Sequence, residues 1–327
     1  WNSETHSRNR DDSVPNSLRD RMVDHRLSVA PMVDVTTHHF RMLIRCISPL
    51  PVLWTEMTWD RSILSAGCPD ISAEEQPVVL QLGGCCPERL ARAAVLVEKA
   101  GYNELNLNCG CPATLGFTTS GEARERYGVR LMLEPELVAR CCASIIAAVN
   151  IPLSVKCRLG VDAHDSFDEL LRFVRCVSAA GVRHFVVHAR KAILGLDTSK
   201  NRSVPPLRHD WVARLADAFP DLSFTVNGGI HSLAHAATLL RGGVVGAMVG
   251  RKARDDPMLF AQSGVLYGGG SEGGGPEGGG SESGGPEAVP SRREVLARYC
   301  AYADEAHASA ADTGACVRRA SQLVGSR

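Results

Sequence analysis

Eight short apolar segments, separated by stretches with helical periodicity, are the feature that most constrains the fold of this 327-residue chain. Many of them are almost continuously apolar, as expected of parallel strands covered on both faces. Strands alternating with helices indicate an α/β fold with one parallel sheet, and eight parallel strands close a (β/α)8 TIM barrel. No Gly-x-Gly-x-x-Gly motif follows the first segment, which further favours a barrel over an open sheet. The predicted strands are Leu27–Val33, Val52–Met57, Val78–Gly84, Glu104–Cys111, Leu153–Gly160, His184–Arg190, Ser223–Gly229 and Gly246–Arg251.

The segments between these strands predict helices. Apolar residues recur on one face over Glu88–Ala100 and Glu134–Val149, and again around Leu170 to Val177. Ser232 is the expected N-cap of a further helix that begins at Leu233.

Composition changes abruptly after the eighth segment. Residues 268–287 read GGGSEGGGPEGGGSESGGPE, which cannot bury apolar surface and predicts a flexible linker. The predicted organisation is a polar tail (1–24), a barrel (25–266), a linker (267–289) and a partial, apparently truncated helical domain (290–327). In that last part, Val295, Tyr299, Tyr302 and Ala306 are the expected anchors of a helix, which is too short to form its own core and must pack on the barrel or belong to a larger domain.

The overall charge gives no sign of a nucleic-acid partner. The chain has 36 basic and 36 acidic residues, so a local basic patch would have to attract RNA. No apolar run of about 18 residues occurs, so the sequence predicts no membrane span. We expect an intracellular protein, cytoplasmic or organellar, that acts as a monomer.

Twelve cysteines are many for a chain of this length. They lie within apolar runs, and the adjacent pairs at 85–86 and 141–142 suit ordinary disulfides poorly. No Cys-x-x-Cys pair occurs, so the sequence predicts no metal site, and the thiols are expected to be reduced and mostly buried.

Polar residues gather at the predicted strand ends, where barrel enzymes carry their active sites. Asn227–Gly229 and Gly250–Arg251 follow strands seven and eight. Loops at these two positions commonly bind phosphate, because glycine lets backbone N–H groups approach an anion. The other strand-end residues are Pro31, Met32, Glu56, Gln81, Asn108, Cys111, Lys156, Arg158, His188, Arg190 and Lys191.

Three of these features admit more than one interpretation. Lys156 could form a Schiff base, place a cation beside a flavin ring, or be a barrel residue with no chemical role. Cys111, in the turn Gly-Cys-Pro, could serve as an acid or nucleophile, but spacing alone does not choose between it and Cys109. A basic loop with Arg190, Lys191, Lys200 and Arg202 could contact a phosphate backbone or be a solvated loop.

Several segments, taken together, resemble the tRNA-dihydrouridine synthases. The similar segments are LSVAPMVDVT (27–36), WTEM (54–57), LQLGG (80–84), LNLNCGCP (105–112), VKCRLG (155–160), VHARKA (187–192) and VNGGI (226–230). NRSVPPL (201–207) resembles the A-type branch, whose targets are D-loop uridines 20 and 20a. Residues 113–127 form a longer loop than the family has, and YGVRLM (127–132) matches the segment that follows.

The resemblance implies an FMN-dependent enzyme that is reduced by NADPH and then reduces uridine in the tRNA D-loop. It implies that Cys111 is the acid that protonates uracil C5, that Asn108 contacts the uracil, and that Lys191, Asn201 and Arg202 contact RNA. With the residues named above, the substrate and RNA candidates are Asn108, Gly110, Arg158, Arg190, Lys191, Lys200, Asn201 and Arg202. The implied FMN ligands are Pro31, Met32, Val33, Gln81, Lys156, His188, Asn227, Gly228, Gly229, Gly250 and Arg251.

Other functions remain compatible with these residues. One is an FMN barrel similar to dihydroorotate dehydrogenase, acting on a free pyrimidine. Another is a tRNA-binding protein that holds flavin but turns over little, and a lysine Schiff-base aldolase is a third.

Overall fold

The computed structural model describes residues 23–113, 127–267 and 289–308. Eight parallel strands form one sheet in the order β1-β8-β7-β6-β5-β4-β3-β2. A parallel bridge between Ser28 and Val52 joins the outer strands and closes the barrel, so the predicted fold is confirmed. The strands are β1 Leu27–Val29, β2 Leu53–Trp59, β3 Val78–Gly83, β4 Glu104–Cys109, β5 Leu153–Arg158, β6 His184–His188, β7 Ser223–Asn227 and β8 Gly246–Val249.

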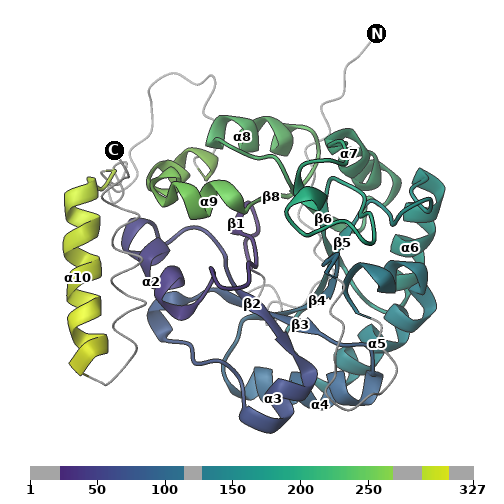
Figure 1. Ribbon diagram of the computed structural model, residues 1–327, viewed down its shortest axis with the longest axis horizontal. Helices are drawn as coiled ribbons and strands as arrows, with labels where there is room; N and C mark the ends of the chain where they lie inside the picture. Colours follow the sequence, from purple (N-terminus) through teal and green to yellow (C-terminus); the bar gives the residue numbers. More distant parts are fainter. Residues whose placement is uncertain (1–22, 114–126, 268–288, 309–327) are drawn as a thin grey trace, which may run out of the picture.

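Helices surround this ring of strands (Figure 1). The predicted capping by Ser232 is confirmed, since its hydroxyl accepts a hydrogen bond from the backbone N–H of His235 at 3.1 Å. The α-helices are α2 His38–Ile47, α3 Asp60–Ala66, α4 Pro87–Lys99, α5 Pro135–Ala148, α6 Phe167–Ala179, α7 His209–Ala218, α8 Leu233–Arg241, α9 Arg251–Asp255 and α10 Arg292–Ala308. Short 3-10 helices are η1 Ala73–Glu75, η2 Gly128–Leu133, η3 Lys200–Arg202 and η4 Pro257–Leu266.

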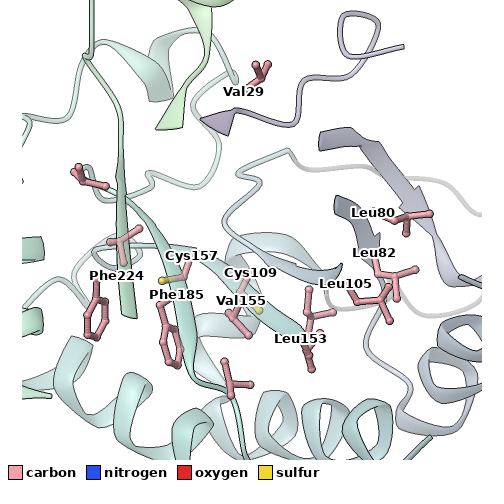
Figure 2. Close-up of a cluster of buried hydrophobic side chains, with 14 of the residues drawn as sticks. Val29, Leu80, Leu82, Leu105, Cys109, Leu153, Val155, Cys157, Phe185 and Phe224 are labelled. Carbon is pink, nitrogen blue, oxygen red and sulfur yellow. The ribbon is translucent and has the colours of Figure 1, made fainter. Parts of the chain in front are cut away.

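The main apolar core lies between the strands and the helices. Alternate residues of each strand point outward into this layer, as Leu105, Cys109, Val155 and Cys157 do in Figure 2. Side chains on alternate positions point into the barrel, because strand residues alternate between the two faces.

The interior of the barrel is more polar than the sequence suggested. Glu104, Asn106, Ser154 and Thr225 are at most 3% exposed. A smaller apolar cluster shares the interior, formed by Ala30, Val52, Trp54, Val79, Val186 and Met248. Buried polar groups are costly unless they are hydrogen-bonded, so the partners of these side chains organise the barrel.

Most strands end before their predicted limits. β1 stops at Val29, and β7 stops at Asn227. The residues that follow leave the ladder because Pro31 lacks an N–H group and because Gly228 and Gly229 adopt positive φ angles of 106° and 68°. These residues form the loops at the carboxyl end of the barrel.

The cysteines are free thiols among the described residues. Cys109, Cys141, Cys142 and Cys157 are buried, and of the others described Cys300 alone is exposed. The predicted Gly-rich linker lies outside the described residues. No described helix has the length and apolar character needed to cross a bilayer.

Helix α10 packs beside α2 on the outside of the barrel (Figure 1). Two of the expected anchors, Val295 and Tyr299, are fully buried. The Tyr299 hydroxyl donates to the backbone oxygen of His39 at 3.3 Å, and Tyr302 is hydrogen-bonded to Nδ1 of His39 at 2.5 Å. The domain boundaries themselves remain a prediction.

Replacing Tyr299 with Ala should therefore lower the free energy of unfolding by about 3 to 5 kcal/mol, because a buried aromatic ring is lost. Arg293→Ala, on the exposed face of α10, is the matched control and should change stability by less than about 0.5 kcal/mol. Urea denaturation followed by circular dichroism measures both. Equal stability of the two variants would contradict the docking of α10.

Candidate active site

A cavity of about 460 Å³ opens at the carboxyl ends of the strands. All eleven residues predicted as cofactor ligands line this cavity. Of the other candidates, the cavity is also lined by Asn108, Gly110, Cys111, Arg158 and Arg202. The structure thus brings together residues from seven of the eight strands or the loops that follow them, while their individual roles remain predictions.

Cys111 is presented to the cavity by a turn that Asn108 builds. The side-chain oxygen of Asn108 accepts hydrogen bonds from the backbone N–H groups of Gly110 at 3.0 Å and Cys111 at 2.9 Å. Such asparagine-centred turns are favoured where a strand ends. The position of the Cys111 thiol therefore depends on the orientation of the Asn108 side-chain amide.

A second segment holds the same cysteine from the other side. Val129, in η2, donates its N–H to the backbone oxygen of Cys111 at 2.9 Å. Gly128 has φ +60°, and an added Cβ there would lie 2.4 Å from that oxygen. Glycine is required at this position because both the backbone conformation and the available space exclude a side chain.

The structure distinguishes Cys111 from Cys109. Strand alternation would point both thiols the same way if the strand reached residue 111, but β4 ends at Cys109. Cys109 faces the helices and is fully buried (Figure 2). Burial raises the pKa of its thiol well above the ordinary range, with a smaller contribution from Cys142. Cys111 is the thiol at the cavity.

A row of amides and hydroxyls continues from Asn108 into the barrel. Its Nδ2 donates to Gln81 at 2.7 Å, Gln81 Nε2 donates to Asn106 at 2.8 Å, and Asn106 Nδ2 donates to the Ser154 hydroxyl at 2.9 Å. Because each amide uses both its donor and its acceptor, the orientation of Asn108 is fixed by residues on β3, β4 and β5.

Lys156 extends from β5 into the cavity. Its ammonium donates to Oδ1 of Asn227 at 3.0 Å, and Asn227 Nδ2 donates to the backbone oxygen of Met248 at 2.8 Å. Asn227 is therefore oriented with its acceptor toward Lys156. Burial, assisted by the charge of Arg158, lowers the pKa of Lys156 to about 8.

Two glycines open one wall of the cavity. An added Cβ at Gly228 would lie 2.5 Å from the ring of His188, and one at Gly229 would lie 2.3 Å from Leu207. His209 Nε2 is 2.7 Å from the backbone oxygen of Gly228 and fixes the turn. The peptide groups of this turn are thus left accessible from the cavity, as a phosphate-binding turn requires.

The cavity wall is strongly cationic. Six lysine or arginine residues line it, while Asp34 is the one acidic residue among the described residues that do so. Burial, and then the charges of Arg158, Lys156, Arg190 and Arg251, lowers the pKa of His188 well below its ordinary value. The six cations are Lys156, Arg158, Arg202, Arg251, Lys252 and Arg254. Lys252 and Arg254 are ion-paired with Asp256 and Asp255 at 3.0 and 2.7 Å, so the other four supply the local positive field within a chain of zero net charge.

Arg158 ties the loop after β4 to the loop after β6 at the cavity. Its guanidinium donates to the backbone oxygens of Gly110 at 2.9 Å, Lys191 at 3.1 Å and Asn201 at 3.0 Å. Arg158 is only 3% exposed. The hydrogen bonds of Arg158 thus support the loops. Its direct contact with RNA stays a prediction.

Four predicted RNA contacts lie outside the cavity lining. The fully buried Asn201 bonds its side chain to the backbone of Ile193 and Leu196, so it shapes the loop that carries Arg202. Lys191 forms an ion pair with Asp165 at 2.8 Å. The other two are Arg190, which donates to the backbone oxygens of Ser203 and Pro205, and the exposed Lys200.

Comparison with known proteins identifies the family. The family model described as dihydrouridine synthase (Dus) matches residues 28–268. The chain belongs to the dihydrouridine synthase family.

Relatives within the dihydrouridine synthase family cover most of this chain. A tRNA-dihydrouridine(20/20a) synthase of Shewanella oneidensis is 42% identical over 253 residues, 76% of this chain and 73% of the relative. One of Synechocystis sp. is 40% identical over 283 residues, with 85% and 78% covered. One of Xanthomonas axonopodis pv. citri is 44% identical over 236 residues, with 71% and 69% covered.

Several residues that line the cavity were not among those predicted from the sequence. Lys252 and Arg254 follow the predicted Arg251, and the run Arg-Lys-Ala-Arg could have drawn attention to them. Met248 lies inside the barrel, which strand alternation predicts. The other missed residues are Ala30, Asp34, Val35, Met57, Pro112, Thr198, Ile230 and His231.

The lowered pKa of Lys156 predicts a specific effect of pH on stability. The pKa of Lys156 is about 8 in the folded chain and has its ordinary, higher value in the unfolded chain. At pH values between the two, the unfolded chain binds more protons than the folded chain. The free energy of unfolding should therefore rise with pH over this window. Relative to Lys156→Met, the wild type should gain roughly 1 to 3 kcal/mol between about pH 7 and pH 10.

Urea denaturation of both proteins across this range measures the effect. Taking the difference removes the contribution of the titrating cysteines, which both proteins share. A difference that stays constant with pH would show that Lys156 keeps an ordinary pKa.

Proposed function

We propose that this protein is a tRNA-dihydrouridine synthase that reduces the uracil C5=C6 bond at D-loop uridines 20 and 20a. The proposal names FMN as the cofactor and NADPH as its reductant. The observation that carries it is that one cavity contains both the Cys111 thiol and a cationic, glycine-lined wall. The names of the bacterial relatives, tRNA-dihydrouridine(20/20a) synthases, supply the substrate.

The residues around the cavity suit FMN. The turn at Gly228 and Gly229, with Arg251 nearby, would hold its phosphate through backbone N–H groups and a charged guanidinium. Lys156 would place positive charge beside the flavin ring, where reduction adds negative charge. When bound, the flavin supplies the hydride that is added to uracil C6.

Cys111 would supply the proton. Addition of hydride at C6 leaves negative charge at C5, because this bond is conjugated with the C4 carbonyl, and an acid close to C5 must then donate a proton. Arg158, which donates to the backbone oxygen of Gly110, and Arg202 line the same cavity as this thiol.

Binding of tRNA would use the cations at the cavity mouth. A uridine in folded tRNA has to leave its stack to reach a cavity inside a barrel. Arg202, Lys252 and Arg254 line the cavity and would contact the adjoining phosphates, and Lys191 and Lys200 would extend the basic surface along the loop. Asn108, Gly110 and Asn201 would position the base and this loop.

Family membership makes a reductase of free pyrimidines or a Schiff-base aldolase the weaker interpretation. A tRNA-binding flavoprotein with little turnover remains an alternative. Turnover by an enzyme would depend on the Cys111 thiol, whereas binding of tRNA and flavin would not. The relatives named here come from bacteria and give no support to an organellar location.

Cys111→Ala should lower the rate of dihydrouridine formation at least about 100-fold, because the acid is lost. FMN content and reduction of the flavin by NADPH should be unchanged, since neither step uses the thiol. Mass spectrometry of digested tRNA measures the product, and absorbance follows the flavin.

The matched control for this experiment is Cys109→Ala, which removes the thiol two residues away that faces the core. It should keep its turnover while losing about 1 kcal/mol of stability. Turnover by Cys111→Ala at the wild-type rate would remove the proposed acid. A wild type with bound FMN and no turnover would instead favour the tRNA-binding flavoprotein.

Gly228→Ala should abolish copurification of FMN, because the new Cβ would overlap His188 and displace the phosphate-binding turn. Gly243→Ala is the control: Gly243 also has a positive φ, 98°, but nothing lies within 4 Å of an added Cβ. It should carry similar backbone strain, about 1 kcal/mol, and retain the flavin. Equal flavin content in the two variants would show that this turn does not bind the phosphate.

A further inference from the structure

Three potential metal ligands meet inside the opposite, amino end of the barrel. His25 precedes β1, Glu104 begins β4 and His184 begins β6. One ligand atom from each lies within 4.8 Å of the other two. His25 Nε2 is 2.7 Å from Glu104 Oε2, and His184 Nδ1 is 3.8 Å from Glu104 Oε1. We call these residues the floor cluster.

The floor cluster is shielded from solvent. The side chains of His25, Glu104 and His184 are 9%, 4% and 13% exposed. No lysine or arginine of the described residues forms an ion pair with Glu104. A carboxylate in such surroundings needs a nearby positive charge, because removing it from water is costly.

Several polar atoms around the cluster lack partners within the described residues. Both His25 Nδ1 and His184 Nδ1 are buried without a hydrogen bond. Ser28 Oγ and Trp54 Nε1, which also belong to the amino half of the barrel, are likewise buried without a hydrogen bond. Buried polar groups normally have partners. Of these atoms, His184 Nδ1 lies 3.8 Å from Glu104 Oε1, so it is placed to bind a ligand that this carboxylate shares.

Neighbouring hydroxyl groups orient two of the three side chains. The Ser154 hydroxyl donates to Glu104 Oε1. Thr225 Oγ1 is 2.9 Å from His184 Nε2, so Nδ1 of this ring faces Glu104. Protein metal sites commonly have such outer contacts, in which the second histidine nitrogen binds an oxygen while the first binds the ion.

We propose that His25 Nε2, Glu104 and His184 Nδ1 form a structural site for a divalent transition ion of the zinc class. Two imidazoles and one carboxylate are a known zinc ligand set. Adjacent ligand atoms of a tetrahedral site are about 3.3 Å apart for bonds of about 2.0 Å. The separations of 2.7 Å for His25 and 3.8 Å for His184 from the Glu104 oxygens lie on either side of this value, so small side-chain rotations would complete the site.

The ion would have a structural role in this position. It would join the segment before β1 to β4 and β6 and would neutralise Glu104. It would also fix one end of the polar row, since Ser154 contacts both Glu104 and Asn106. The proposal is independent of the proposed enzymatic function, because it concerns the other end of the barrel.

The test is the zinc content of the full-length chain expressed in zinc-supplemented medium, measured by plasma mass spectrometry. We expect each of the variants Glu104→Gln and His184→Leu to contain one zinc ion per chain less than the wild type. Glu104→Gln preserves size and hydrogen bonding and so tests the site if His184→Leu fails to fold. The matched control is His235→Leu, which removes a half-buried histidine elsewhere and should keep the full zinc content.

Zinc bound by cysteines would be common to all four proteins and cancels in the comparison. Replacement by Co²⁺ adds a spectroscopic check, because nitrogen and oxygen ligands give ligand-field absorption without a sulfur-to-metal charge-transfer band. Equal zinc content in the wild type and both cluster variants would overturn the proposal, as would a wild type without zinc. In either case the cluster would be held by hydrogen bonds alone.

Discussion

The side-chain amide of Asn108 is the interaction on which the carboxyl end of the barrel depends. Its oxygen accepts the N–H groups of Gly110 and Cys111, and its nitrogen donates to Gln81. Gln81 is held by Asn106, which is held in turn by Ser154. The position of the Cys111 thiol therefore depends on a row of hydrogen bonds that runs through the barrel interior. This suits an acid that has to meet one carbon atom of a substrate, because small displacements of a reacting group reduce rates strongly.

The loops at this end are tied to one another as well as to the strands. Arg158 donates to backbone oxygens of the loops after β4 and β6, and Val129 binds the backbone of Cys111. Gly128 and Gly228 occupy places where a Cβ would overlap neighbouring atoms. Close approach of backbone segments thus leaves room for a ligand and at the same time limits their movement. Precise placement at an active site requires such supporting contacts.

The barrel interior links its two ends by polar contacts. Apolar residues such as Trp54 and Met248 fill part of it, while the row from Asn108 to Ser154 continues to Glu104 and the two histidines. Each buried polar group in the row has a partner, so its burial costs little. Beside the row, by contrast, His184 Nδ1 is buried without a partner among the described residues, and this motivates the proposed ion site.

The sequence by itself determined the eight strands, the order of the helices, the capping by Ser232 and the grouping of the cofactor candidates at one cavity. These features depend on local periodicity and on glycine and proline, whose effects act within a few residues. The tertiary structure decided that Cys111 and not Cys109 faces the cavity, because that depends on where β4 leaves the ladder. It also decided that Arg158 and Asn201 support loops, and that Glu104 meets His25 and His184. Those residues are 79 and 80 positions away from Glu104 in the chain. No local pattern encodes such contacts, since barrel closure alone brings the side chains together.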